Sequence, residues 1–148
     1  IYSYHDFSNS ISREEMLSWI SKKKSPNCIY KFAVTPKNIS EEELFFFFFK
    51  EISNDYLIIG IAMGEIGVYS RLFGDRFGSF ATYCCIGKPR APGQVNIITL
   101  KKIRENYSDK PLPEIGTKLT CVRYNKVLLH SVSVIPEIPP AIAAAAKR

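Results

Sequence analysis

Apolar residues along the chain gather into short runs that are separated by longer mixed stretches. The runs are residues 1–4, 28–34 (CIYKFAV), 55–62 (DYLIIGIA) and 79–86 (SFATYCCI). Runs of this length with few polar breaks predict strands that are buried on both faces of a sheet. The first run leads directly into His5 and Asp6, where we expect the strand to end.

The stretches between these runs carry helix signals. Ser12 is followed by Glu15, and Ser40 by Glu43, at the spacing of a capping box. Glycine and proline residues mark the breaks between segments. Helices are therefore predicted over residues 12–24, 40–52, 67–76 and 97–107.

Strands that alternate with amphipathic helices predict an α/β fold with a parallel sheet covered by helices. A (βα)8 TIM barrel and a doubly wound sheet are the two candidates. Polar residues that follow the predicted strands favour the barrel, because the active face of a TIM barrel lies at the carboxyl ends of its strands. A closed barrel of this type has eight βα units, so the last four units alone would supply half of its wall.

We assign residues 1–108 to this half-barrel and residues 109–148 to a linker and tail. Pro111 and Pro113 mark the linker, and residues 134–148 (VIPEIPPAIAAAAKR) combine a proline cluster with an alanine run. Such a low-complexity composition does not predict a packed element.

Composition narrows the class of protein. With 148 residues, of which 46% are hydrophobic, one ordinary core is expected. The net charge of +6 could attract carboxylates, but basic and aromatic residues are not interleaved in a base-stacking pattern, so no nucleic-acid partner is expected. The longest apolar stretch, residues 56–63, is too short to span a bilayer, and no signal peptide is visible. We therefore expect a cytoplasmic protein without a membrane partner.

The cysteines suggest neither a metal site nor a disulfide framework. They are Cys28, Cys84, Cys85 and Cys121. Their spacing fits neither a zinc site nor the paired cysteines of a small secreted domain. Buried thiols and no bound metal are the expectation.

One lysine lies inside an apolar strand. Lys31 is flanked by Tyr30 and Phe32, and burial there would lower the pKa of its ammonium toward that of a nucleophilic amine. Such an amine can form an imine with a ketone. The structural alternative is a lysine whose ammonium reaches solvent or pairs with a carboxylate.

His5 and Arg71 are further candidates for chemistry. His5 follows a predicted strand, so its imidazole can reach a substrate at the lip of the sheet and act as acid and base; a capping or core histidine is the alternative. Arg71 lies early in a predicted helix, where its guanidinium can hold a carboxylate through two hydrogen bonds. A surface ion pair would explain a single arginine equally well.

Four segments, taken in order, resemble a known family. They are residues 3–7 (SYHDF), 31–36 (KFAVTP), 63–72 (MGEIGVYSRL) and 91–94 (APGQ). These segments resemble the SxHDF, K(I/F)Ax(M/T)P, MGxxGxxSR and APGQ motifs of type I 3-dehydroquinate dehydratases, and their spacings are similar. The resemblance covers roughly residues 1–107.

The resemblance implies a TIM-barrel lyase that removes water from 3-dehydroquinate to give 3-dehydroshikimate, in the shikimate pathway of aromatic amino acid biosynthesis, without a metal or organic cofactor. It implies that Lys31 forms a Schiff base with the ring ketone. His5 would take the adjacent proton and then protonate the departing hydroxyl. Arg71 and Gln94 would hold the substrate carboxylate, and Met63 would line the ring pocket.

Two departures from the family pattern matter. Arg90 stands where the family often has a substrate-contacting serine, so it could add a second cation at the carboxylate or point outward. The first four strands of the family, which carry a glutamate that orients the histidine, have no counterpart in these residues. We therefore expect either a homodimer or an association with a separate N-terminal half-barrel.

The tail carries a second, poorer resemblance. Residues 117–122 (TKLTCV) and 130–133 (HSVS) resemble the first strand and the HSxSP loop of shikimate dehydrogenases, with Val134 in place of the proline. A degenerate start of such a domain, as in a bifunctional enzyme, and an unrelated tail both stay open.

Three functions are compatible with these patterns. The first is a dehydratase or its catalytic half, the second is a non-catalytic half-barrel that retains the motifs, and the third is a Schiff-base barrel of the aldolase kind. The joint presence of His5, Lys31, Arg71 and Gln94 favours the first. An aldolase would not require the carboxylate-binding loop at residues 91–94.

Overall fold

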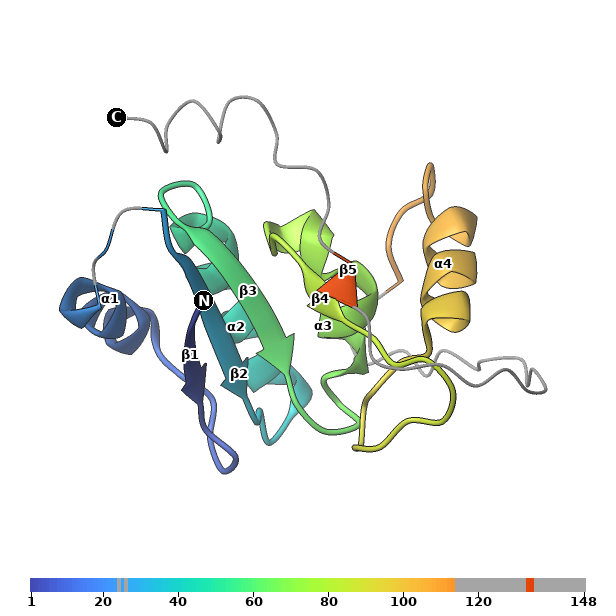
Figure 1. Ribbon diagram of the computed structural model, residues 1–148, viewed down its shortest axis with the longest axis horizontal. Helices are drawn as coiled ribbons and strands as arrows, with labels where there is room; N and C mark the ends of the chain where they lie inside the picture. Colours follow the sequence, from blue (N-terminus) through green and yellow to red (C-terminus); the bar gives the residue numbers. More distant parts are fainter. Residues whose placement is uncertain (24, 26, 114–132, 135–148) are drawn as a thin grey trace.

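The chain forms a parallel sheet with helices packed on one face. The computed structural model describes residues 1–23, 25, 27–113 and 133–134. The sheet contains, in spatial order, β1 (Tyr2–His5), β2 (Ile29–Val34) and β3 (Leu57–Ala62). Helix α1 (Arg13–Lys22) connects β1 to β2, and α2 (Ile39–Ile52) connects β2 to β3 (Figure 1). The first three predicted strands and the helices between them are therefore confirmed.

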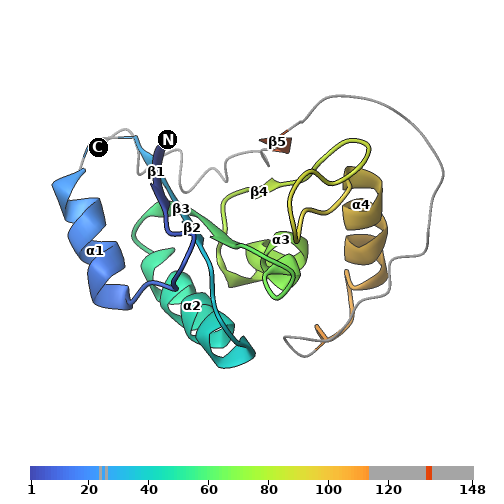
Figure 2. The ribbon, with the colours of Figure 1, turned by 90° about the horizontal axis from the view of Figure 1, so that it is seen from below.

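One face of the sheet packs against α1 and α2, which lie on the same side of it (Figure 2). Alternate strand residues point to this face, because side chains in a strand alternate between the two sides. Phe32 and Ile58 meet Met16 of α1 and Phe49 of α2 there, all fully or almost fully buried. This aromatic-rich layer is the largest buried cluster among the described residues.

The opposite face of the sheet carries the other alternate residues. Ala33 of β2 and Ile59 of β3 form a second buried cluster with Phe80 and Ala81, which follow β3 in the chain. Lys31 belongs to this face, since it pairs in register with Ser3 on one side and Ile59 on the other. The lysine therefore lies on the face turned away from α1 and α2.

The two predicted capping boxes have different outcomes. Ser12 caps α1 as expected: its hydroxyl accepts from the backbone N–H of Glu15, whose carboxylate accepts in return from the N–H of Ser12. The box predicted at Ser40 is wrong, because α2 begins earlier and Asn38 is its N-cap, accepting from the N–H of Glu41. Asparagine is as good a cap as serine, and it comes first in the chain.

The third predicted helix is divided in two. Helix α3 (Val68–Phe73) is followed directly by a 3-10 turn, η1 (Gly74–Phe77), and α4 (Ile97–Asn106) lies beside α3 at the far end of the chain's described part (Figure 1). Among the described residues, no helix is both long enough and apolar enough to cross a membrane.

The predicted strand at residues 79–86 is largely wrong. Only β4 (Thr82–Tyr83) is a strand, and it pairs antiparallel with β5 (Ser133–Val134) instead of extending the parallel sheet.

Hydrogen bonds along the outer edge of β3 explain the difference. Phe80 N–H donates to Ile58 O as a fourth parallel strand would, but Gly60 N–H and Ala62 N–H donate to the hydroxyls of Ser79 and Ser70. Serine side chains thus take over positions that a backbone ladder would fill. The sheet stops at β3, although the chain beyond it stays alongside.

Candidate active site

Lys31 and His5 are in direct contact on the face of the sheet that is turned away from α1 and α2, called the open face below. Lys31 Nζ lies 3.1 Å from His5 Nε2, so one nitrogen donates a hydrogen bond to the other. His5 ends β1, and its register partner in β2 is Ala33, two residues beyond Lys31. Because residues two apart in a strand share a face, this register places both side chains on the same side at the carboxyl end of the sheet.

The surroundings of Lys31 favour a neutral amine. The side chain is half-buried, and its Nζ lies 4.8 Å from the centroid of the Tyr83 ring. Burial lowers the pKa of Lys31, and the positive charge of Arg71 lowers it further. The free amine is the nucleophilic form, so these surroundings suit attack on a carbonyl carbon.

His5 is exposed, yet its protonation is coupled to the lysine. Partial desolvation lowers the pKa of His5, and the charge of Lys31 lowers it further. Two cations at 3.1 Å would repel each other, so the hydrogen bond requires at least one neutral partner. The pair can therefore hold a proton and exchange it between the two nitrogens.

The backbone beside His5 is fixed by the neighbouring strand. Asp6 N–H donates to Ala33 O, and the hydroxyl of Thr35 donates to Asp6 O. The carboxylate of Asp6 also accepts from the N–H groups of Ser8 and Asn9, which hold its pKa below the ordinary value. These hydrogen bonds fix the turn after β1 in the absence of a ligand, and this limits the movement of His5.

Arg71 is buried on α3, with only 8% of its surface exposed. Its Nε is buried without a hydrogen-bond partner among the described residues, and burial lowers the pKa of the guanidinium. A buried guanidinium with an unused donor is a site where a carboxylate would be bound strongly. The charge of Arg71 also lowers the pKa of Lys31, so the two cations influence each other.

The glycines of the sequence motifs allow loops to pack closely around this region. A Cβ on Gly67 would overlap the carbonyl oxygen of Ala62, and a Cβ on Gly93 would overlap that of Gly64. Gly64 and Gly93 also have positive φ angles, which other residues rarely adopt. The loop at residues 91–94 therefore packs directly on the loop that follows β3.

The remaining predicted site residues lie around this region without touching the lysine–histidine pair. Met63 follows β3 and is half-buried against the second core cluster. Gln94 uses its Oε1 to accept from the N–H of Arg90, and Arg90 is itself exposed. In the described part of the chain, the structure brings neither Gln94 nor Arg90 into hydrogen-bonding contact with Lys31.

Two residues that the sequence patterns did not single out belong to the site's framework. Tyr83 places its ring against Lys31, and Thr82 donates its hydroxyl to Arg71 O at 3.0 Å. The only available signal was their position in a predicted strand, where successive side chains point to opposite faces.

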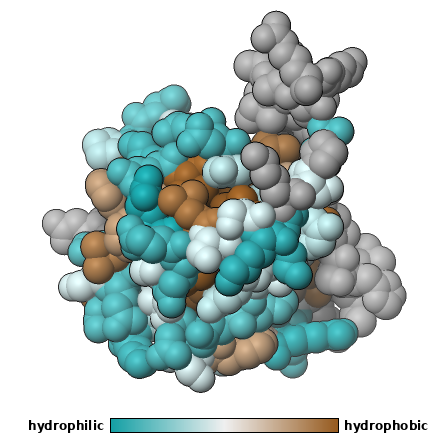
Figure 3. All heavy atoms as spheres, turned by 90° about the vertical axis from the view of Figure 1, so that its left-hand side faces the viewer, coloured by the Kyte–Doolittle hydropathy of each residue, from teal (hydrophilic) through white to brown (hydrophobic). Residues whose placement is uncertain are grey.

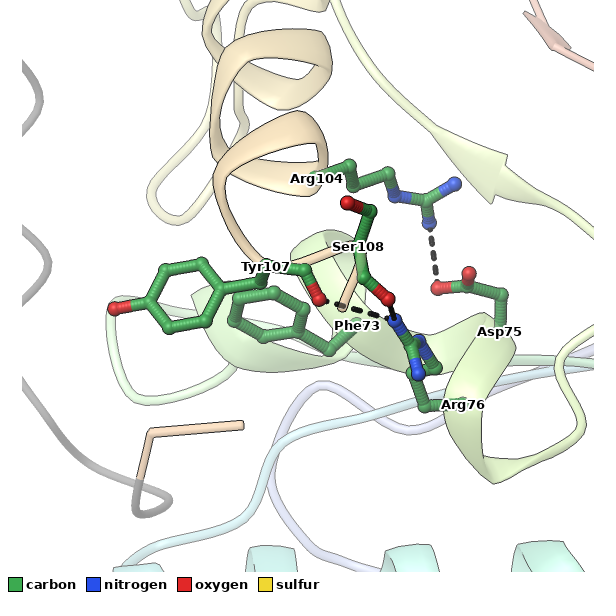
Figure 4. A pocket seen from close by; sticks show the side chains of 6 residues that line it. All are labelled: Phe73, Asp75, Arg76, Arg104, Tyr107 and Ser108. Atoms are coloured by element: carbon green, nitrogen blue, oxygen red, sulfur yellow. Dashed lines mark hydrogen bonds and ion pairs between the residues drawn. The ribbon is translucent and has the colours of Figure 1, made fainter. Parts of the chain in front are cut away.

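A separate cavity of about 260 Å³ lies away from these residues, between α3, η1 and the end of α4 (Figure 4). Its arginines are already engaged. Arg76 donates to the carbonyls of Tyr107 and Ser108, and Arg104 pairs with Asp75 at 2.9 Å (Figure 4). The side chains around this cavity join the end of α4 to η1, and neither Lys31 nor His5 lines it. In the described residues, no three His, Cys, Asp or Glu side chains are grouped to hold a metal.

Comparison with known proteins identifies the family. The chain is 44% identical over 106 residues to the 3-dehydroquinate dehydratase of Methanocaldococcus jannaschii, covering 70% of this chain and 46% of that relative. The Escherichia coli (strain HS) enzyme of the same name is 33% identical, with 70% and 42% covered. The chain therefore spans about half the length of these relatives.

Comparison with solved structures gives the same family. The 3-dehydroquinate dehydratase of Aquifex aeolicus superposes with a TM-score of 0.64 at 27% identity, over 72% of this chain and 48% of that one. The type I enzyme of Clostridium difficile, solved with covalently modified comenic acid, gives 0.61 at 29% identity, over 70% and 42%. Residues 1–110 match the family described as type I 3-dehydroquinase, and the chain belongs to that family.

Proposed function

We propose that this chain is the C-terminal, catalytic half of a type I 3-dehydroquinate dehydratase, which converts 3-dehydroquinate to 3-dehydroshikimate and water in the shikimate pathway. The contact of 3.1 Å between Lys31 and His5 carries the proposal, because it joins a half-buried amine to a group that can move protons. The reaction needs no metal or organic cofactor.

The amine of Lys31 attacks the ring ketone and forms an imine after loss of water. The imine nitrogen withdraws electrons from the neighbouring carbon, so His5 can take a proton there. The imidazolium of His5 then donates that proton to the departing hydroxyl, and hydrolysis of the imine releases the product. One imidazole thus serves in turn as base and acid.

Arg71 holds the substrate carboxylate in this proposal. Its buried Nε is an unused donor, and ion pairing there offsets the cost of its desolvation. Gln94 would join it after exchanging its bond to the Arg90 N–H for one to the substrate, and Arg90 would supply a second cation at the rim. Met63 would line the pocket for the ring.

The proposed architecture is half of a TIM barrel in residues 1–108. In the described residues β1 has a sheet partner on one side only, and Ile1, Tyr2 and Phe7 beside it are exposed. Figure 3 shows this side of the molecule, where apolar atoms gather near the middle of a mainly hydrophilic face. An open parallel edge of this kind pairs readily with another strand. An N-terminal half-barrel, or a second copy of the chain, is the proposed partner.

The proposal for residues 109–148, a linker followed by a degenerate start of a shikimate dehydrogenase-like domain, lies outside the described residues except for 109–113 and 133–134.

A non-catalytic half-barrel is the competing function, because the chain spans less than half of several relatives. The two functions differ in one observable, namely whether Lys31 reacts with the ligand.

Borohydride reduction tests this directly. With dehydroshikimate present, in the chain alone or combined with an N-terminal half-barrel, reduction should attach the ligand to Lys31, as shown by peptide mass spectrometry. Lys37→Met is the matched control, since Lys37 lies near the same edge but donates to Asn9. A ligand-dependent adduct on a different lysine, or no adduct in either preparation, would show that the assignment is wrong.

A further inference from the structure

The short helix that carries Arg71 is held at its end by side chains from other segments. Helix α3 has six residues, too few to be stable by itself. The last carbonyls of a helix have no intrahelical partners. In α3, Arg71 O accepts from the hydroxyl of Thr82 at 3.0 Å, and Leu72 O accepts from Nε of Arg104 at 2.8 Å.

Thr82 connects the two halves of the site. It is buried in β4, and its side chain points to α3, whereas the ring of the next residue, Tyr83, faces Lys31 at 4.8 Å. Alternation along the strand therefore ties the backbone of Arg71 and the amine of Lys31 to two consecutive residues. A movement of Arg71 relative to Lys31 would therefore disturb the contact of Thr82 with Arg71 O or the contact of Tyr83 with Lys31.

The other end of the Arg71 segment is fixed as well. The hydroxyl of Ser70 accepts from Ala62 N–H at 2.9 Å and lies 2.7 Å from Gly67 O, so the first turn of α3 is joined to the end of β3. Ser70 acts on the sheet side and Thr82 on the side of β4. Arg71 lies between these two contacts. Of the two, only the hydroxyl of Thr82 donates to the backbone carbonyl of Arg71 itself.

We propose that Thr82 is a positioning residue, which sets the distance between the carboxylate-binding Arg71 and the imine-forming Lys31. This inference rests on the proposed function of those two residues. A substrate that is bound through a carboxylate and a ketone at once needs a fixed spacing between the two groups that hold it. Loss of the hydroxyl would leave Arg71 O without this buried donor and release the end of α3.

The experiment measures how borohydride labelling of Lys31 depends on dehydroshikimate concentration. Thr82→Val keeps the shape but removes the donor, and should raise the half-saturating concentration by roughly three- to tenfold, while labelling at saturation stays complete. Thr82→Ser should restore the wild-type value. Ser53→Ala is the matched control, because Ser53 donates to Lys50 O at the end of α2, away from the site.

Arg71→Ala distinguishes positioning from general destabilisation. It should raise the half-saturating concentration further than Thr82→Val, and adding Thr82→Val to it should change nothing more, since the group being positioned is gone. An unchanged value in Thr82→Val overturns the inference. So does an equal shift in Thr82→Ser, or a full additional shift in the Arg71→Ala background.

A second readout separates this inference from the proposed function. The buried Nε–H of Arg71 should give a slowly exchanging guanidinium signal in ¹H–¹⁵N NMR, assigned by its loss in Arg71→Lys. Thr82→Val should accelerate its exchange and Thr82→Ser should not. If Lys31 is never labelled, the Schiff-base function fails, and this exchange still decides the role of Thr82: faster exchange supports it, and unchanged exchange overturns it.

Discussion

Burial shifts the pKa of both Lys31 and Glu42, which lie in two different regions of this protein, but only the surroundings of Lys31 are arranged for chemistry. Lys31 lies half-buried on the open face of the sheet, in contact with exposed His5. Glu42 lies on α2 with no exposed surface, and the backbone N–H of Ser70 in α3, which lies beside its carboxyl group, only partly offsets the effect of burial.

The same physical cause acts on both groups. Desolvation favours the neutral form, so it lowers the pKa of Lys31 and raises that of Glu42 to about 7. In its neutral form Lys31 is a nucleophile that a ligand can reach, and the imidazole of His5 lies beside it. The neutral glutamic acid is enclosed by helices. A shifted pKa therefore indicates a functional site only where access and a chemical partner accompany it.

The largest expected effect in this comparison comes from removing the partner of Lys31. His5→Ala in the assembled enzyme should lower kcat by about two to four orders of magnitude, the usual contribution of a positioned acid and base. Imine formation on Lys31 should survive at a lower rate. Steady-state turnover together with borohydride labelling separates the two steps. Wild-type turnover in His5→Ala would contradict the claim that the region of Lys31 and His5 is arranged for chemistry.

A smaller effect is expected at Glu42. Its pKa is raised in the folded chain, so the folded state keeps its proton more tightly than the unfolded state. The contribution of Glu42 to the free energy of unfolding is therefore fully present below about pH 4.5, and it is lost as the pH rises to about 7. The loss should be about 3 kcal/mol, because each unit of pKa difference between the folded and unfolded states corresponds to about 1.4 kcal/mol. Glu42→Gln should abolish it, as measured by urea unfolding of the full chain at several pH values.

Glu14→Gln is the control for that experiment, because Glu14 is an exposed glutamate on a different helix, α1. It should leave the pH dependence unchanged. Parallel stability curves for the wild type and Glu42→Gln would mean that Glu42 has an ordinary pKa and that the comparison with Lys31 has no basis.

Local signals in the sequence predicted the elements of the first half well. The apolar runs located β1, β2 and β3 to within about two residues, and Ser12 located the start of α1. Both signals depend on side chains that are neighbours along the chain. The pairing of Lys31 with His5 came from the resemblance to the dehydratase family, and the register of β1 and β2 brings the two side chains into contact.

Contacts between distant segments could not be predicted in this way. The apolar run at residues 79–86 looks like a strand, but the hydroxyls of Ser70 and Ser79 occupy the edge of β3 that it would need. The contact of Thr82 with Arg71 O likewise joins separate segments and leaves no periodic signal. Only the three-dimensional arrangement shows these roles.

Glu42 is a different kind of omission, since a signal was present. It precedes Phe45, Phe46 and Phe49 at three, four and seven positions, so it falls on the buried stripe of α2. A carboxyl on such a stripe indicates a buried acid. The helical spacing of Glu42 and these three phenylalanines is the informative property.

Activity with and without a separate N-terminal half-barrel tests the central claim, that this chain is the catalytic half of a dehydratase. Dehydration is followed through the ultraviolet absorbance of the conjugated product. We expect negligible turnover by the chain alone, because the proposed function assigns to the N-terminal half the groups that orient His5 and hold the substrate hydroxyls. Turnover should appear when an N-terminal half is added, and not when Lys31→Met replaces the wild-type chain. Efficient turnover by a monomeric 148-residue chain, or activity that survives Lys31→Met, would contradict the claim.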